Sequence, residues 1–494
     1  MRACRVRAMG GDNGIVTWRR GWQCGAMVVL VQALPLLALV VLLGTGRASA
    51  PVACAVALLM TVPAAVLAVP AGAQAGAWLW DYGVRSASQG LWLALIPVGI
   101  VLGGLVFHDS VRPRGEQAPS DANAVDTLFT GAFLLGGFTE TVTGFGVGTV
   151  FALAAFRRVG VTGPVAAALA IFSQLLIPWG GLGPGTSVGA ALAGLVPQEL
   201  AGRNAVILAV ELPLVLPLFW FLCAKAGHKV GVRQGLGQVG WVLAEGALLV
   251  AAHLTVAWEV CGLLATGIVL AARLLIAAPP RGMDGWRRGL VAAGPYLALA
   301  GVLLGSRLWR GAPAAAPFEG LPALPLNHAV VGLWVVGLGL AVMRGSVGGA
   351  LRRAVERGRR PAVALLMFVL LARFLAFAGV PQALAGALAA SFGAFAPFAS
   401  PVLAGVAGFF AGSNVGSNSA MMPLQAELGR VAGLGPLVLP AIQNGTMCLL
   451  LSPQVCAIAS GLAGGGATPA GIWRLCWPIF PLALVVGMAF VALG

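Results

Sequence analysis

The sequence Gly137-Phe-Thr-Glu-Thr-Val-Thr-Gly-Phe-Gly146 places one carboxylate, Glu140, and three threonines between glycines in an otherwise hydrophobic region. A glycine inside a helix costs about 1 kcal/mol relative to alanine, so a straight helix through this stretch is unfavourable. An ionisable side chain at membrane depth costs at least about 2.5 kcal/mol and is by default a functional-site candidate. Within a bilayer, irregular backbone is tolerated where it lines a cavity. The stretch therefore predicts a broken helix that lines a polar cavity.

The composition is typical of a membrane protein. Of the 494 residues, 59% are hydrophobic and 9% are charged, whereas soluble domains carry about 25% charged residues. Repeated apolar runs of roughly 20 residues predict membrane-spanning helices, and the alternating segments of a β-barrel are missing from the sequence. We expect an all-α polytopic membrane protein with roughly 12–14 transmembrane helices and half-helices. Its expected location is the plasma membrane (bacterial inner membrane), as a multi-pass protein.

The net charge of +15 comes almost entirely from arginine. These arginines lie between hydrophobic runs, where cytoplasmic loops gather positive charge, so we attribute them to topology and expect no nucleic-acid partner. The tail 1–25, the segment 225–233 and the loop 344–360 are expected to share the cytoplasmic side. The eight cysteines show no metal-binding spacing, so we expect neither a metal nor a cofactor.

The pattern of hydrophobic runs divides the chain into four segments. They are the basic cytoplasmic tail 1–25, a first transmembrane half 26–250 with a broken helix at 127–156, linking helices and the basic cytoplasmic loop 344–360 within 251–360, and a second-half repeat 361–494 with a broken helix at 401–427. Within the last segment, single spans are expected at 361–378 and 473–493. Pro178–Gly185 is too rich in glycine and proline for a regular helix.

Two pseudo-repeats contain these broken or re-entrant segments. Gly137-Phe138 and Gly163-Pro164 in the first half correspond to Gly408-Phe409 and Gly435-Pro436 in the second. Interrupted segments at matching places in two halves indicate the binding site of a secondary transporter. The alternative is chance similarity between glycine-rich membrane segments, and the sequence leaves open whether the repeat is inverted.

Four motifs carry a resemblance to a known family: Phe138–Gly146, Gly180–Gly183, Gly412–Asn418 and Ser452-Pro-Gln454. Together they resemble the lactate permease family of proton-coupled monocarboxylate transporters, and the chain looks like a divergent member of it. Where the family usually has an Asn-Thr pair, this chain has Ser173-Gln174. Where the family usually has a lysine, it has Leu449. The second departure leaves the particular substrate open.

Glu140 is the predicted proton carrier, and the resemblance supports a glutamate at this place. The alternative is a structural glutamate that caps the neighbouring half-helix or bonds to Thr143. For the anion, half-helix N-termini supply free N–H groups and a favourable dipole; a tight packing interface of small residues is the alternative. The predicted substrate-binding residues are Thr139, Thr141, Thr143, Gly144, Gly412, Ser413, Asn414, Ser417, Asn418, Arg373, Asn444, Ser452 and Gln454.

Three further groups lie within or near the spans. Arg373 is a candidate replacement for the cation missing at position 449, because a buried arginine must face a cavity, a carboxylate or the interface. Glu211 lies within a span and is interpreted as locally paired or snorkelling. Glu245 and His253, eight residues apart on one helix, are close enough for a pair.

The resemblance implies a secondary active transporter that performs H⁺-coupled symport of L-lactate or a related monocarboxylate such as glycolate. A Na⁺-coupled or exchange carrier of another organic anion stays open, because unwound carbonyls near Asn414 and Asn418 could bind Na⁺. An intramembrane enzyme is a remote alternative that would need a paired nucleophile and base or clustered acids; we expect no enzyme. The expected partners are a small carboxylate anion, a proton and the lipid bilayer. The oligomeric state is left open.

Overall fold

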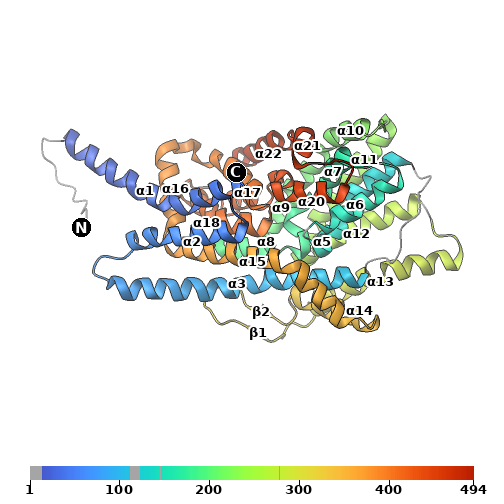
Figure 1. Cartoon of the computed structure of the whole chain (residues 1–494), viewed down its shortest axis with the longest axis horizontal. Coiled ribbons are helices and arrows are strands. Elements are labelled where there is room, and N and C mark those ends of the chain that lie inside the picture. Colours follow the sequence, from blue (N-terminus) through green and yellow to red (C-terminus); the bar gives the residue numbers. More distant parts are fainter. Residues whose placement is uncertain (1–13, 112–122, 145, 278) are drawn as a thin grey trace.

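The computed structural model describes residues 14–111, 123–144, 146–277 and 279–494, with side chains from residue 26 onward. The chain is almost entirely helical, and many long helices run along the long axis of the molecule (Figure 1). One short antiparallel ladder joins β1 (Ala314–Ala315) to β2 (Leu324–Pro325) in the connection between α13 and α14.

Nine helical segments in the described ranges are long and apolar enough to cross a membrane, or eleven when each of two bent pairs is counted as one span. This confirms the predicted all-α polytopic membrane protein. The nine are α1 (Gly14–Gly44), α2 (Ala50–Leu67), α3 (Ala75–Val111), α9 with α10 (Pro197–Leu214, Leu216–Lys225), α11 (Val232–His253), α12 (Trp258–Ala277), α13 (Gly282–Ser306), α15 (Val347–Phe377) and α16 with α17 (Val380–Phe392, Ala399–Ala411).

The first broken helix has its break at residues 144–146. α4 (Ala124–Phe129) continues through a π-helical turn, η1 (Thr130–Leu135), into α5 (Gly136–Thr143), and α6 (Val147–Arg158) follows the break. Gly144 and Gly146 have φ angles of 68° and 83°, values that glycine adopts without steric cost. The break lies inside the predicted range 127–156, and Phe145 lies outside the described residues.

A re-entrant hairpin follows each broken helix. In the first half, α7 (Gly163–Ala170) leads through the 3₁₀ turns η2 (Ile171–Gln174) and η3 (Ile177–Leu182) into α8 (Pro184–Ala193). In the second half, η4 (Gly393–Phe398) precedes α17, which breaks at Gly412 before α18 (Asn414–Val431); the hairpin is α19 (Val438–Asn444), η5 (Met447–Leu451) and α20 (Pro453–Ala463). The two halves therefore repeat the same order of elements.

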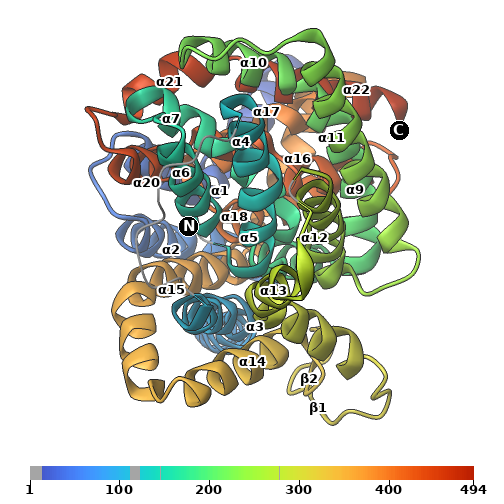
Figure 2. The same cartoon turned by 90° about the vertical axis from the view of Figure 1, so that its right-hand side faces the viewer.

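The hairpins are exchanged between the halves. α8 of the first hairpin packs against α18, whereas α20 of the second hairpin packs against α6 and α7. Viewed along the helices, α5 and α18 lie near the centre of the molecule (Figure 2). Each half thus completes the surroundings of the break in the other half.

Aromatic packing fixes the first broken helix. Phe129, Phe133, Phe172 and Phe219 are buried, and their ring centroids lie 5.2–6.2 Å apart. Such aromatic pairs contribute about 0.5–1.5 kcal/mol each beyond the area they bury. They tie α4 and η1 to η2 and α10, and so position α5 with its glutamate.

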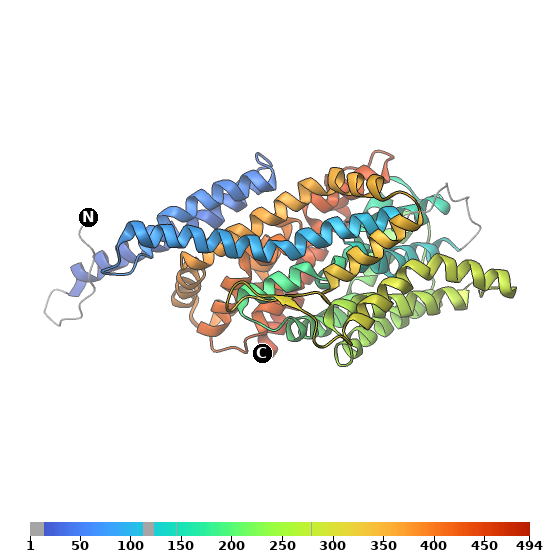
Figure 3. The same ribbon diagram turned by 90° about the horizontal axis from the view of Figure 1, so that it is seen from below.

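Two predicted boundaries need correction. The predicted loop 344–360 is helical from Val347, because α15 extends along α3: Arg353 pairs with Asp109 at 2.8 Å and Gly358 packs against Leu102. Figure 3 shows these two helices side by side. The predicted single span 473–493 is a bent pair instead, α21 (Pro469–Cys476) and α22 (Ile479–Leu493), with a 51° bend where Pro478 interrupts it. The helix α16 was not predicted.

The expected sidedness also needs correction at the amino terminus. α1, α2 and α3 are three successive passes, and the end of α3 meets the start of α15 through the Asp109–Arg353 pair. The start of α1 therefore lies at the end of the molecule opposite the connection between α14 (Ala329–Met343) and α15 (Figures 1 and 3). Residues 1–13 of the predicted tail lie outside the described residues. The end of the molecule where α15 begins is called the α15 end below. The segment 225–233 does lie at the α15 end, since the neighbouring Gln234 bonds to Asn123, just before α4.

Candidate functional site

A cavity of about 480 Å³ lies between the two broken helices. The first turns of α6, α8, α18 and α20 surround it, and Gly146, Gly185, Asn414 and Gln454 are among its lining residues. A helix N-terminus carries free backbone N–H groups and a partial positive charge, so it attracts an anion. The cavity is therefore suited to a small anionic molecule.

Glu140 lines this cavity and also caps α6. Its two carboxylate oxygens accept hydrogen bonds from the backbone N–H groups of Gly146 at 3.2 Å and Gly148 at 2.9 Å. The side chain is only 5% exposed, and Gln174 lies next to it on the cavity wall. The capping role that the sequence left as an alternative is present, and it coexists with access to the cavity.

The other helix termini differ in how they are capped. Ser413 accepts a hydrogen bond from the first turn of α18 at 3.0 Å, and Ser452 does the same for α20 at 3.2 Å. α8 has no side-chain cap, because its N-cap residue is Gly183. Gly185, in the first turn of α8, lines the cavity next to Asn414. This terminus presents its backbone donors to the cavity without a protein acceptor at the cap.

Asn444 is the hub of a buried amide cluster behind the cavity wall. Its side-chain oxygen accepts from Asn418 at 2.7 Å and from Asn414 at 3.2 Å. Its side-chain nitrogen donates to Thr186 at 2.9 Å and to Asn204 at 2.7 Å. The cluster joins α8, α9, α18 and α19, so Asn444 positions Asn414 rather than lining the cavity itself.

Several predicted binding residues make contacts within the protein and do not line the cavity. Thr139, Thr141 and Thr143 donate to carbonyls of their own helical segment at 2.8, 2.8 and 2.6 Å, as threonine commonly does within a helix. Ser417 accepts a bond from Gln443 at 2.7 Å, and Gly144 packs against the Gly180-Gly181 break. The residues from the predicted set that line the cavity are Glu140, Gly412, Ser413, Asn414 and Gln454.

Arg373 does not line the cavity. Its guanidinium bonds to Gln89 on α3 and lies 4.7 Å from the ring centre of Phe377. Leu449 does line the cavity, so the residue that replaces the family's lysine is part of its wall. The structure therefore places Arg373 away from the cavity wall, and its role as the missing cation stays a prediction.

Sequence reasoning missed three polar residues of the wall: Thr149, Gln174 and Arg357. Arg357 is the one basic side chain among the described lining residues, and it lies with Ala50 and Pro361 toward the α15 end. It was interpreted only as a topology signal. Thr149 lies two residues after the start of α6. Nothing in the sequence distinguishes it from the other threonines near the break.

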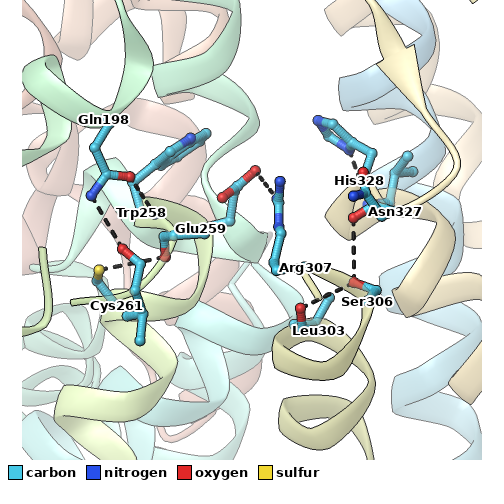
Figure 4. A network of polar contacts seen from close by, with 12 residues as sticks. Gln198, Trp258, Glu259, Cys261, Leu303, Ser306, Arg307, Asn327 and His328 are labelled. Atoms are coloured by element: carbon cyan, nitrogen blue, oxygen red, sulfur yellow. Dashed lines mark hydrogen bonds and ion pairs between the residues drawn. The ribbon is translucent and has the colours of Figure 1, made fainter. Parts of the chain in front are cut away.

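At the end of the molecule opposite Arg357, the start of α12 takes part in a network of polar contacts (Figure 4). Trp258 packs so closely on Gly183 that a Cβ there would lie 2.2 Å from its ring. The next residue, Glu259, is 5% exposed and pairs with Arg307 at 2.5 Å, and His328 lies across from this pair at the start of α14. These contacts link α12, α13 and α14 at the end opposite Arg357.

Comparison with known proteins finds a family match in the second half of the chain. Residues 335–491 match the model of the L-lactate permease family. The L-lactate permease of Halalkalibacterium halodurans is 32% identical over 117 residues, which cover 23% of this chain and 22% of that protein. The carboxyl-terminal third of the chain is thus similar to the L-lactate permease family. The match to this relative thus spans less than a quarter of its length. With nine candidate spans among the described residues, the chain is a multi-pass plasma membrane protein.

Two solved structures are similar to the chain at low identity. One is the YdaH transporter of Alcanivorax borkumensis, at 16% identity and a TM-score of 0.43 over 85% of this chain and 89% of that one. The other is MtrF of Neisseria gonorrhoeae, at 13% identity and a TM-score of 0.43 over 92% and 96% of the two chains.

Proposed function

We propose that the chain is a secondary active transporter that carries a small monocarboxylate, L-lactate or glycolate, across the plasma membrane together with a proton. The observation that carries the proposal is the cavity at which four helix N-termini and one buried glutamate meet. Paired broken helices in two halves are the arrangement that secondary transporters use for binding. The match of residues 335–491 to the L-lactate permease family supports the same class.

The proposed subsite for the carboxylate is the first turn of α8. This terminus has no side-chain cap, and Gly185 leaves its backbone open to the cavity. The Asn414 amide lies beside it; its Nδ2 group bonds to the Ile177 carbonyl at 3.4 Å and to Asn444 at 3.2 Å, and it would exchange one of these long bonds for a bond to the substrate. A substrate carboxylate here would face backbone dipoles rather than a lysine, which fits Leu449 on the same wall.

Glu140 is the proposed proton-coupling residue. Its ionised form and a substrate carboxylate would be two like charges in one poorly solvated cavity, and they would repel each other. Protonation of Glu140 removes this repulsion and so links proton uptake to anion uptake. The same protonation weakens the hydrogen bonds from Gly146 and Gly148. Proton binding would therefore loosen the helix break between α5 and α6.

The proposed transport cycle starts from a conformation open at one end. The cavity reaches the α15 end at Arg357, whereas Trp258 and the Glu259–Arg307 pair cover the opposite end. The arginine-rich end is cytoplasmic by the positive-inside rule. In the other conformation, the hairpins would close around Arg357 and separate from Trp258.

A Na⁺-coupled carrier is the second candidate. The side-chain oxygens of Asn414 and Asn418 are buried without a hydrogen-bond partner among the described residues, and uncharged oxygens beside a broken helix are typical Na⁺ ligands. An enzyme is not favoured: Gly185–Gly189 fits the pattern G-x-S-x-G, but it lies on the regular helix α8 rather than on a strand–helix turn.

The test is uptake of labelled L-lactate or glycolate into proteoliposomes that contain the purified protein. A pH gradient and a Na⁺ gradient are imposed separately at the same membrane potential. Accumulation driven by the pH gradient alone supports the proposal. Accumulation driven only by Na⁺ would exclude proton coupling through Glu140 and favour the second candidate.

A further inference from the structure

A second buried carboxylate, Glu211 on α9, lies outside the cavity described above. It is 4% exposed, and its Oε2 atom has no hydrogen-bond partner among the described residues. None of the ion pairs in the described chain includes it. An unpaired carboxylate is costly to bury in its charged form. Glu211 therefore needs an explanation that packing does not supply.

Glu211 faces a small separate cavity of about 20 Å³. This space is large enough for one water molecule, which needs about 10–15 Å³. Its walls come from α17, α22 and the hairpin break between α19 and η5, where Gly445, Thr446 and Met447 line it. The carboxyl group thus meets a water-sized space at the point where the second hairpin is not helical.

α9 is attached to this same break through a second residue. Asn204 precedes Glu211 by seven residues, so both lie on one face of the helix. Asn204 donates to the Ala441 carbonyl at 2.8 Å and accepts from Asn444 at 2.7 Å. The other end of the hairpin turn, Leu449, lines the main cavity. A movement caused by a change of charge at Glu211 can therefore be transmitted to the main cavity through the hairpin backbone from Gly445 to Leu449.

Resting on the proposed function, we propose that Glu211 and one water molecule form a second proton-binding site on the side of the hairpin that faces away from the substrate. A hydronium ion from the solvent reaches the carboxylate before the site is sealed: one of its O–H bonds breaks, the O–H bond of the carboxylic acid forms, and a neutral water molecule stays in the small cavity. Opening of the hairpin hydrates the site, the O–H bond breaks, and the proton leaves on water. The charge of Glu211 thereby couples hairpin position to proton movement.

Glu211 is the one titratable side chain among the described residues that line this small cavity. The other helices packed against α9, namely α8, α10, α11 and α12, carry Lys225, Arg233, Glu245, His253, Glu259 and Arg273, none of which lines it. Cys448 on η5 is the titratable side chain that faces Glu211 from the hairpin. The sequences of α17, α19 and α22 contain no acidic, basic or histidine residue. On α9 itself, Arg203 points to the chain end, where it bonds to the Gly494 carbonyl at 3.2 Å.

Glu245 on α11 provides a matched control. It is fully buried, and neither of its carboxyl oxygens has a partner among the described residues. Unlike Glu211, it lines neither of the two cavities. A general effect of removing a buried carboxyl group should therefore appear in both variants, whereas a proton-binding role at the hairpin should appear only at Glu211.

The experiment compares Glu211→Gln, Glu211→Asp and Glu245→Gln in proteoliposomes. For Glu211→Gln we expect pH-driven accumulation to fall about ten-fold while substrate exchange stays within about two-fold of wild type, a typical coupling between sites. Glu211→Asp should restore part of the accumulation, and Glu245→Gln should match wild type. Unchanged accumulation in Glu211→Gln, or equal losses at both positions, would overturn the proposal.

Infrared difference spectra on addition of L-lactate give a readout that does not depend on a proton gradient. The carbonyl band of a protonated carboxylic acid should change in wild type and in Glu245→Gln. In Glu211→Gln the component due to Glu211 should be missing, and the component that remains should be the one that Glu140→Gln removes. A wild type without pH-driven uptake would refute the proposed function, while this band would still decide the protonation of Glu211. An identical band in Glu211→Gln would refute the second site alone.

Discussion

The carboxylate of Glu140 accepts a hydrogen bond from the backbone N–H of Gly148 across the helix break, at a distance of 2.9 Å. This bond joins the end of α5 to the start of α6 and brings the acid to the cavity wall. One residue therefore holds the break together and carries the charge that a bound anion meets.

The first prediction concerns Glu140→Gln. Glutamine keeps an acceptor for one N–H group but cannot exchange a proton, so pH-driven uptake should be lost and substrate exchange retained. The weaker cap should lower the stability of the folded protein by about 1–3 kcal/mol. Transport assays and thermal unfolding of the purified protein measure the two effects. Loss of exchange as well, in a correctly inserted protein, would assign Glu140 to binding or packing instead.

The second prediction concerns the open terminus of α8. A Cβ at Gly185 would lie 2.8 Å from the side chain of Asn414, so Gly185→Ala displaces that amide and narrows the anion subsite. We expect the half-saturation concentration for substrate to rise at least about ten-fold, which corresponds to a loss of 1.4 kcal/mol. Gly180→Ala is the control, because Gly180 lines the same cavity and a Cβ there meets nothing within 4 Å. Equal effects of both substitutions would argue against the subsite.

The third prediction concerns Arg357 at the wide end of the cavity. Its charge should attract the anion, so Arg357→Ala should raise the half-saturation concentration for efflux from the α15 side about three- to ten-fold at low salt. The effect should shrink at high ionic strength because salt screens exposed charges. Arg359→Ala removes an exposed charge of the same helix that does not line the cavity. It should leave transport unchanged; a matching loss there would indicate a general surface-charge effect.

The fourth prediction is a pH dependence at the covered end. His328 caps α14 by accepting a bond from the Val330 N–H at 3.2 Å, and a ring protonated at this nitrogen cannot accept it. Burial, with a smaller contribution from Arg307, lowers the pKa of His328 below its ordinary value of 6.5, while Glu259 opposes this shift. Because the folded pKa is the lower one, the stabilisation is complete above 6.5 and is lost as the pH falls through the folded value.

Thermal unfolding between about pH 8 and about pH 5 measures this dependence. His328→Asn keeps a capping acceptor that does not titrate, so its unfolding temperature should fall less on acidification than that of wild type. Parallel curves for the two proteins would show that another group is responsible for the acid sensitivity.

The sequence was most informative about features that depend on the local backbone, such as the helix breaks. The break at Gly144–Gly146 and the break at Gly412 follow from glycines that adopt left-handed φ angles, a property of the residue type itself. The identity of Glu140 as a buried acid follows from its surroundings in the chain. The threonines next to it could not be assigned in this way, because a helical threonine can bond either to a ligand or to its own backbone.

Only the tertiary structure decided which side chains reach the cavity. Arg357 and Arg373 lie on the same helix, α15, and are sixteen residues apart, which places them on nearly opposite faces at about 100° per residue. Packing of α15 along α3 turns Arg357 toward the cavity and Arg373 toward Gln89. The sequence by itself determined a membrane protein with two paired broken helices around a buried glutamate. The rotation of α15 and the exchange of α8 and α20 between the halves depend on contacts between residues far apart in the chain, and local pattern does not encode them.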